Sequence, residues 1–165
     1  LYGSPTFAGS RAGAAIAGAW AVINYLGIEG YMKKAEIIMK TARKFIDGIN
    51  SIKGLEVLGK PDASIFSFHS TKFDTYMIGQ EMAKKEWSLD NLQLPPGLHL
   101  MVTPAHENVV EKFLEDLKEV VNDLKNNPRE PEGMAAMYGA MASLPDPSMV
   151  VPFVENFLDS LTQPE

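Results

Sequence analysis

An apolar stripe that recurs every three or four residues is the sequence feature that most constrains how this chain can fold. The stripe lies within residues 28–49, and lysine and arginine occupy positions between its members. Its members are Tyr31, Met32, Ala35, Ile38, Met39, Ala42, Phe45, Ile46 and Ile49. This spacing predicts a long amphipathic helix that buries one face.

Beyond Lys53 and Gly54 the pattern changes to short apolar runs separated by turn residues, which is typical of strands. The predicted strands cover residues 55–58, 64–69, 87–94 and 98–102. The other predicted helices cover residues 11–25, 74–85 with Asp74 as N-cap, 103–125 with Thr103 as cap, 134–141 and 148–161. This order predicts an α/β chain of the α+β kind, with a small, mostly antiparallel sheet covered by helices on one face.

Composition excludes several classes of site. The 165 residues include no cysteine, which excludes disulfides, thiolate metal sites and a cysteine nucleophile. The net charge of −6, with acidic and basic residues interleaved, indicates no nucleic-acid surface. The longest apolar stretch, residues 12–26, is too short to span a bilayer. His69, His99 and His106 lack the close spacing of metal ligands and are expected to be structural or solvated.

The first residues, LYGSPTFAGSRAG, place small and hydroxyl side chains before the start of a predicted helix. Unpaired backbone N–H groups near Gly9 and Ser10, with the hydroxyls of Ser4 and Thr6, could bind an anion there. Taken alone, the loop favours the simpler alternative, in which Ser10 caps the helix and Arg11 is solvated.

The late segment GMAAMYGAMA, residues 133–142, carries three methionines on one helical stripe, with Tyr138 as its only polar tip. The pattern favours a packed helix in a core or an interface. The alternative is a lid or pocket wall in which the Tyr138 hydroxyl faces a ligand.

Three stretches of the chain resemble one enzyme family in continuous register. They are YGSPTFAGSRAG at the start, WSLDNLQLPP in the middle and GMAAMYG near the end. They are similar to Y-A-S-P-T-x-A-G-S-R-P-G, W-[SN]-L-[DN]-x-L-Q-[LF]-P-P and G-M-x-x-x-Y-G of the sphingosine-1-phosphate lyases. This family belongs to the group II decarboxylase branch of the fold type I pyridoxal-phosphate enzymes.

The resemblance implies that the chain is the C-terminal portion of such an enzyme. Residues 1–26 would end the large cofactor domain, 27–127 would form the small domain, and 128–165 would close over the active-site entrance. The family's cofactor-binding lysine follows a histidine, and because the chain has no His-Lys pair, that lysine is expected upstream of Leu1.

The resemblance also assigns site residues. Thr6, Gly9 and Ser10 would contact the pyridoxal 5'-phosphate group, and Tyr2, Ser4 and Arg11 would lie at the substrate or subunit interface. Tyr138 would act as a catalytic residue near the substrate phosphate, and no metal is expected. Ala12 stands where the family commonly has proline, which changes the rigidity of the helix start and removes no functional group.

The implied reaction is cleavage of the C2–C3 bond of sphingosine 1-phosphate to a long-chain aldehyde and phosphoethanolamine. The implied partners are the rest of the lyase chain, a second identical subunit and the phosphorylated sphingoid base. The segment would face the cytoplasm, attached to the endoplasmic reticulum membrane in a eukaryotic parent, and cytosolic or secreted into a host in a bacterial one.

Two other functions remain open at this point. A decarboxylase acting on glutamate or tyrosine would need a cation for the α-carboxylate. Arg129, in a proline-bearing linker, is poorly placed for that role. A non-catalytic interaction module descended from the enzyme is the second alternative.

Overall fold

The computed structural model describes residues 12–142, 148, 151–152, 155–156 and 159–160. It divides into two units, one of Leu1–Tyr31 with Leu144–Glu165 and one of Met32–Ser143. This division does not test the predicted domain boundaries after residues 26 and 127, which stay predictions. The predicted helix over residues 148–161 lies mostly outside the described residues.

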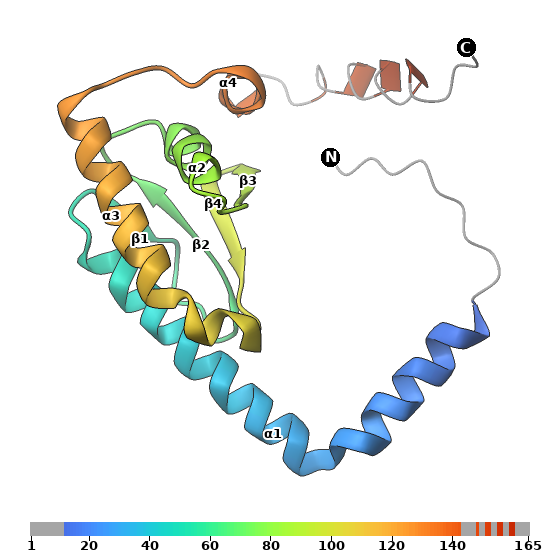
Figure 1. Ribbon diagram of the computed structural model, residues 1–165. Helices are drawn as coiled ribbons and strands as arrows, with labels where there is room; N and C mark the ends of the chain where they lie inside the picture. The colour runs from blue at the N-terminus through green and yellow to red at the C-terminus, as the bar shows by residue number, and fades with distance from the viewer. Residues whose placement is uncertain (1–11, 143–147, 149–150, 153–154, 157–158, 161–165) are drawn as a thin grey trace. The chain divides into compact units, whose positions relative to one another are not determined.

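Helix α1, Gly13–Ser51, combines the two helices that the sequence predicts. At Gly27 its backbone is not helical, with φ 57° and ψ −174° (Figure 1). Only glycine adopts this conformation without a steric penalty, which explains the break predicted there. Gly30, the second predicted break, stays helical.

The unit Met32–Ser143 is built on a four-stranded antiparallel sheet in the order β1-β2-β4-β3. The strands are β1 (Leu55–Val57), β2 (Ile65–Ser70), β3 (Asp90–Gln93) and β4 (Pro96–Met101). In the central pair, Phe66 lies opposite Leu100 and Phe68 lies opposite Leu98. All four of these side chains are buried, so one face of the sheet forms the floor of the core.

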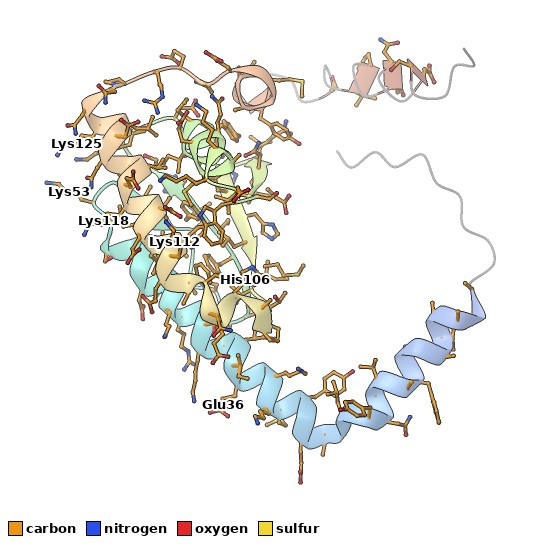
Figure 2. All side chains as sticks on the ribbon, in the orientation of Figure 1. Glu36, Lys53, His106, Lys112, Lys118 and Lys125 are labelled. Atoms are coloured by element: carbon orange, nitrogen blue, oxygen red, sulfur yellow. The ribbon has the colours of Figure 1, made fainter. Side chains whose placement is uncertain are left out.

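Helices α1, α2 (Thr75–Lys84) and α3 (Val110–Asn126) cover that face and share one apolar core with it (Figure 1). Phe45 of α1 is fully buried. The centroid of its ring lies 5.1 Å from the centroid of the Phe113 ring and 6.5 Å from that of the Phe66 ring. Lys118 and Lys125 are exposed on α3 (Figure 2). The predicted class, helices on one face of a small antiparallel sheet, is therefore confirmed.

The apolar stripe of α1 is buried only in its second half. Ala42, Phe45 and Ile49 are buried, whereas Tyr31 and Met32 are 44% and 65% exposed. Gly48 lies under Leu114 of α3, and a Cβ there would be 2.3 Å from the Leu114 Cδ1. This glycine allows the close approach of α1 and α3.

The opposite face of the sheet is mixed: the exposed Ile65 and Met101 lie opposite each other, and two polar pairs lie beside them. His69 lies opposite Glu56 with 3.8 Å between Nε2 and Oε2, and His99 lies opposite Asp90 with 3.7 Å between Nδ1 and Oδ2. The third histidine, His106, accepts the backbone N–H of Thr103 at 2.9 Å and packs edge-on against Phe45. Among the described residues no three His, Asp or Glu side chains gather as a metal site.

Two predicted elements differ from the structure. The predicted helix 103–125 begins as a short 3₁₀ helix, η1 (Pro104–Asn108), and the α-helix starts only after Val109, whose φ is −120°. The predicted strand 87–94 shortens to β3. This happens because the Trp87 N–H bonds the Met82 carbonyl at the end of α2, while Leu94 and Pro95 form the turn between Gln93 and Pro96.

The two ends of α2 differ in how well the residue type suits its position. Asp74 caps the start, as predicted, with Oδ1 accepting the N–H groups of Tyr76 and Met77 at 2.8 and 3.2 Å. At the other end Glu86 has φ 67°, a left-handed conformation. Glycine is the usual residue in this conformation at the end of a helix.

Glu86→Gly should therefore raise the free energy of unfolding by about 1 kcal/mol, because the steric penalty on Cβ disappears. The midpoint of urea unfolding measures this gain. Glu86→Ala is the matched control, since it removes the same carboxylate and keeps Cβ. Equal midpoints for the two variants would contradict the explanation.

Candidate functional site

Tyr138 lies on α4 (Gly133–Ala142), a short helix that follows the irregular segment 127–132. The helix packs on α2 and β3 within the unit Met32–Ser143. The backbone N–H of Glu132 donates to the Gln80 Oε1 at 2.8 Å, which fixes the chain just before α4 begins. A helix is predicted over 134–141, and its existence is confirmed. The side chains of Met134 and Met141 lie outside those that the structure describes, so the packing of the methionine stripe stays a prediction.

The Tyr138 ring packs on the ring of Tyr76, with 6.2 Å between centroids and 44° between planes. Tyr76 is 3% exposed, and its hydroxyl donates to the Leu92 carbonyl at 2.6 Å. Burial raises the pKa of Tyr76, and the neighbouring Asp74 and Tyr138 add to this effect. Tyr138 is half-buried, and its hydroxyl has no hydrogen bond to any residue that the structure describes.

A cavity of about 370 Å³ lies beside this contact. Its walls come from the end of β2, the start of α2, the start of β4 and Gly139 of α4. They include His69, Ser70, Phe73, Asp74, Tyr76 and Pro96. A Cβ at Gly139 would lie 3.6 Å from the Tyr76 ring and 3.8 Å from the Asp74 Oδ2, in ordinary van der Waals contact with both walls.

The cavity by itself does not fit a phosphate group. The part of its lining that the structure describes includes the carboxylate of Asp74 and neither lysine nor arginine. Two hydroxyls of the lining already accept hydrogen bonds from backbone N–H groups. Ser70 Oγ accepts the Phe73 N–H at 2.9 Å, and Thr75 Oγ1 accepts the Ser70 N–H at 3.0 Å. An anion would meet a negative charge there, with no lysine or arginine of the described lining to offset it.

The predicted residues of the opening loop lie outside the part of the chain that the structure describes. They are Tyr2, Ser4, Thr6, Gly9, Ser10 and Arg11. Tyr138 is therefore the one predicted site residue whose surroundings are described. The assignment of all seven stays a prediction.

Arg129 is held by two carboxylates. Its Nη2 lies 2.9 Å from the Glu81 Oε2 and 2.7 Å from the Asp123 Oδ2. Burial alone would raise the pKa of Glu81, but the hydrogen bonds from Arg129 and Lys84 lower it below its usual value. Arg129 is thus engaged in joining α2 to α3, which weighs against a role in binding a substrate carboxylate.

The sequence does not indicate that Tyr76 contacts Tyr138. The position of Tyr76 inside the helix over residues 74–85 predicts burial for a ring among apolar neighbours, and nothing more. Contact between Tyr76 and Tyr138 joins residues far apart in the chain. Strands β3 and β4 and helices η1 and α3 lie between them in the chain, so no local spacing signals the contact.

Comparison with known proteins gives a consistent result. The chain is 44% identical to the sphingosine-1-phosphate lyase of Oryza sativa subsp. japonica, over 97% of the chain and 30% of that protein. The chain thus spans about a third of the length of the curated relatives it matches. No protein-family model matches the chain.

Solved structures agree. The sphingosine-1-phosphate lyase of Burkholderia pseudomallei superposes with a TM-score of 0.74 at 32% identity, over 99% of the chain and 33% of that protein. Glutamate decarboxylase of Lactobacillus brevis, with a TM-score of 0.66 at 15% identity over 73% of the chain and 30% of that protein, shares the fold alone. Over a stretch that makes up about a third of their length, this chain is therefore a homologue of the sphingosine-1-phosphate lyases.

Proposed function

We propose that this chain is part of a pyridoxal-phosphate-dependent lyase that cleaves the C2–C3 bond of sphingosine 1-phosphate. The products are a long-chain aldehyde and phosphoethanolamine. The observation that carries the proposal is the 44% identity with the rice lyase over 97% of the chain. The TM-score of 0.74 with the bacterial lyase adds to this support, because it compares the course of the backbone.

In this proposal the cofactor, when bound, takes up the electrons released as the carbon–carbon bond breaks. Thr6, Gly9 and Ser10 hold its phosphate, and Tyr2, Ser4 and Arg11 face the substrate or a second subunit. The lysine that binds the cofactor belongs to the remainder of a longer chain. All six loop residues lie outside the described residues, so this part of the proposal comes from the resemblance alone.

Tyr138 has a role of its own in the proposal. Its hydroxyl donates a hydrogen bond to the phosphate of the substrate, and a donor to a charged oxygen forms one of the stronger hydrogen bonds. Two observations support this role. The ring is half-buried against Tyr76, and no described residue takes up the hydroxyl.

The proposal extends to assembly and location. The active enzyme is a homodimer in which this segment faces the cytoplasm. None of the helices in the described part of the chain combines the length and apolar character needed to cross a bilayer.

The experiment that tests the function uses the full-length parent protein. Pyridoxal phosphate is added, the absorbance of the bound cofactor is recorded, and sphingosine 1-phosphate is supplied. A long-chain aldehyde is the expected product. Bound cofactor with carbon dioxide released from an amino acid would replace the lyase with a decarboxylase. No cofactor absorbance would replace it with the interaction module.

Tyr138→Phe in the full-length enzyme should lower kcat/KM by about tenfold to a hundredfold, which corresponds to the loss of one hydrogen bond to a charged group. Thermal unfolding should stay within a degree or two of the unmodified enzyme, since the ring is retained. Tyr25→Phe, which removes a hydroxyl from an 89% exposed side chain, is the control. Unchanged kinetics in Tyr138→Phe would remove Tyr138 from the site.

A further inference from the structure

A chain of contacts connects the edge strand β3 to Tyr138. The Leu92 carbonyl of β3 accepts the hydroxyl of Tyr76 at 2.6 Å, and the ring of Tyr76 packs on the ring of Tyr138. Tyr76 therefore contacts the sheet with its hydroxyl and α4 with its ring. A side chain held at both ends has little freedom to change its position.

The surroundings of Tyr76 keep it in place. It is 3% exposed, it lies in the first turn of α2, and Asp74 caps its backbone N–H at 2.8 Å. Gly139, next to Tyr138 in α4, lies close over the same ring, where a Cβ would be 3.6 Å from its Cδ2. This distance is an ordinary van der Waals contact, so α4 lies against the Tyr76 ring at Gly139 as well as at Tyr138.

Helix α4 packs on α2 and β3, and Tyr76 of α2 is the residue whose ring contacts Tyr138. The helix follows the irregular segment 127–132, and the hydrogen bond from the Glu132 N–H to Gln80 fixes only the start of the helix. Tyr138 is five residues beyond Gly133, more than one turn into α4. The ring contact that the structure describes for Tyr138 is with Tyr76.

We propose that Tyr76 is the positioning residue for Tyr138: its hydroxyl, held by the Leu92 carbonyl, fixes the ring on which Tyr138 packs. This proposal rests on the proposed function, in which the Tyr138 hydroxyl binds the phosphate of the substrate. Tyr76 itself does not touch the substrate. Its influence on the reaction passes through the orientation of one neighbouring hydroxyl.

A double-mutant cycle in the full-length enzyme tests the proposal with Tyr76→Leu, Tyr138→Phe and the combined variant. Tyr76→Leu alone should lower kcat/KM on the order of tenfold. The same kinetic constant, kcat or KM, should change in Tyr76→Leu and in Tyr138→Phe. In the Tyr76→Leu background, adding Tyr138→Phe should change kcat/KM less than about twofold, because the hydroxyl is already misplaced.

Met82→Ala is the matched control, because Met82 is a fully buried residue of the same helix with no ring contact to Tyr138. It should lower the thermal stability and leave the full effect of Tyr138→Phe intact. Tyr76→Phe is a second variant that keeps the ring and loses only the hydrogen bond to Leu92. In its background the effect of Tyr138→Phe should shrink at least threefold, and this variant decides the matter if Tyr76→Leu fails to fold.

The outcomes separate two failures. If Tyr138→Phe slows the unmodified enzyme and slows the Tyr76 variants equally, the positioning role of Tyr76 is overturned and the proposed function stands. The same holds if Met82→Ala abolishes the effect of Tyr138→Phe as well, because the effect is then one of general destabilisation. If the unmodified enzyme forms no aldehyde, it is the proposed function that fails.

Discussion

Phe45→Ala should lower the free energy of unfolding by about 3–5 kcal/mol, the range for removing a fully buried aromatic ring from a core. Phe45 is the meeting point of α1, the sheet and α3, through its ring contacts with Phe66 and Phe113. It also packs on His106 in η1. Removing the ring therefore leaves a cavity bordered by four elements, which cannot all move to fill it.

Urea unfolding of the 165-residue chain, followed by circular dichroism, measures this loss as a lower midpoint. Tyr25→Ala is the control, because Tyr25 is of similar size and 89% exposed, and it should change the stability by less than about 0.5 kcal/mol. A loss below about 1 kcal/mol for Phe45→Ala would show that Phe45 is not at the centre of the core.

Asp116→Asn should lower the free energy of unfolding at pH 7 by about 2 kcal/mol. The side chain of Asp116 is 5% exposed and is surrounded by donors. Its Oδ1 lies 2.7 Å from Lys112 Nζ and 3.3 Å from Lys85 Nζ, and its Oδ2 accepts the Trp87 indole N–H at 2.9 Å. The amide would leave two ammonium groups beside each other without their shared carboxylate.

The same carboxylate gives stability a defined pH dependence. The hydrogen bond from Lys112, with those from Trp87 and Lys85, lowers the pKa of Asp116 to about 2, against the effect of its burial. Because the folded pKa lies below the unfolded one, the unfolded state binds the proton first as the pH falls. The stabilisation is complete above about pH 4 and is lost as the pH falls toward 2.

Urea midpoints measured at pH 7, 4, 3 and 2 test this dependence. The difference between the unmodified chain and Asp116→Asn should be largest at pH 7 and nearly vanish at pH 2. Glu36→Gln, which breaks an exposed ion pair with Lys40 on α1, should show a much smaller difference across the same range (Figure 2). A difference that stays constant down to pH 2 would contradict the assignment.

Local signals in the sequence predicted most of the fold. Asp74 is an N-cap because its carboxylate accepts the first free N–H groups of α2. This interaction involves only adjacent residues, so the local sequence predicts it. Phe45 and Ile49 follow the 3.6-residue period and are buried. The kink at Gly27 follows from the residue type alone.

Long-range contacts account for what was not predicted. Trp87 leaves the strand pattern because its backbone ends α2 and its indole reaches Asp116, 29 positions away. Tyr31 and Met32 continue the apolar stripe but stay exposed. The 3.6-residue period shows which side of a helix is apolar, and it does not show whether another element covers that side. In the candidate site, the motif around Tyr138 identifies that residue. Its contact with Tyr76 cannot be predicted in the same way, because it forms only when α4 packs on α2.

The strand order also bears on how this chain avoids self-association. Strands β1 and β3 form the two edges of the sheet, and both are short, with three and four residues. Each edge carries one carboxylate, Glu56 or Asp90, opposite a histidine of the neighbouring inner strand. Short edges with a fixed negative charge are poor templates for a strand from another molecule. Removing the Glu56 and Asp90 carboxylates by substitution would take that protection from both edges and favour edge-to-edge aggregation.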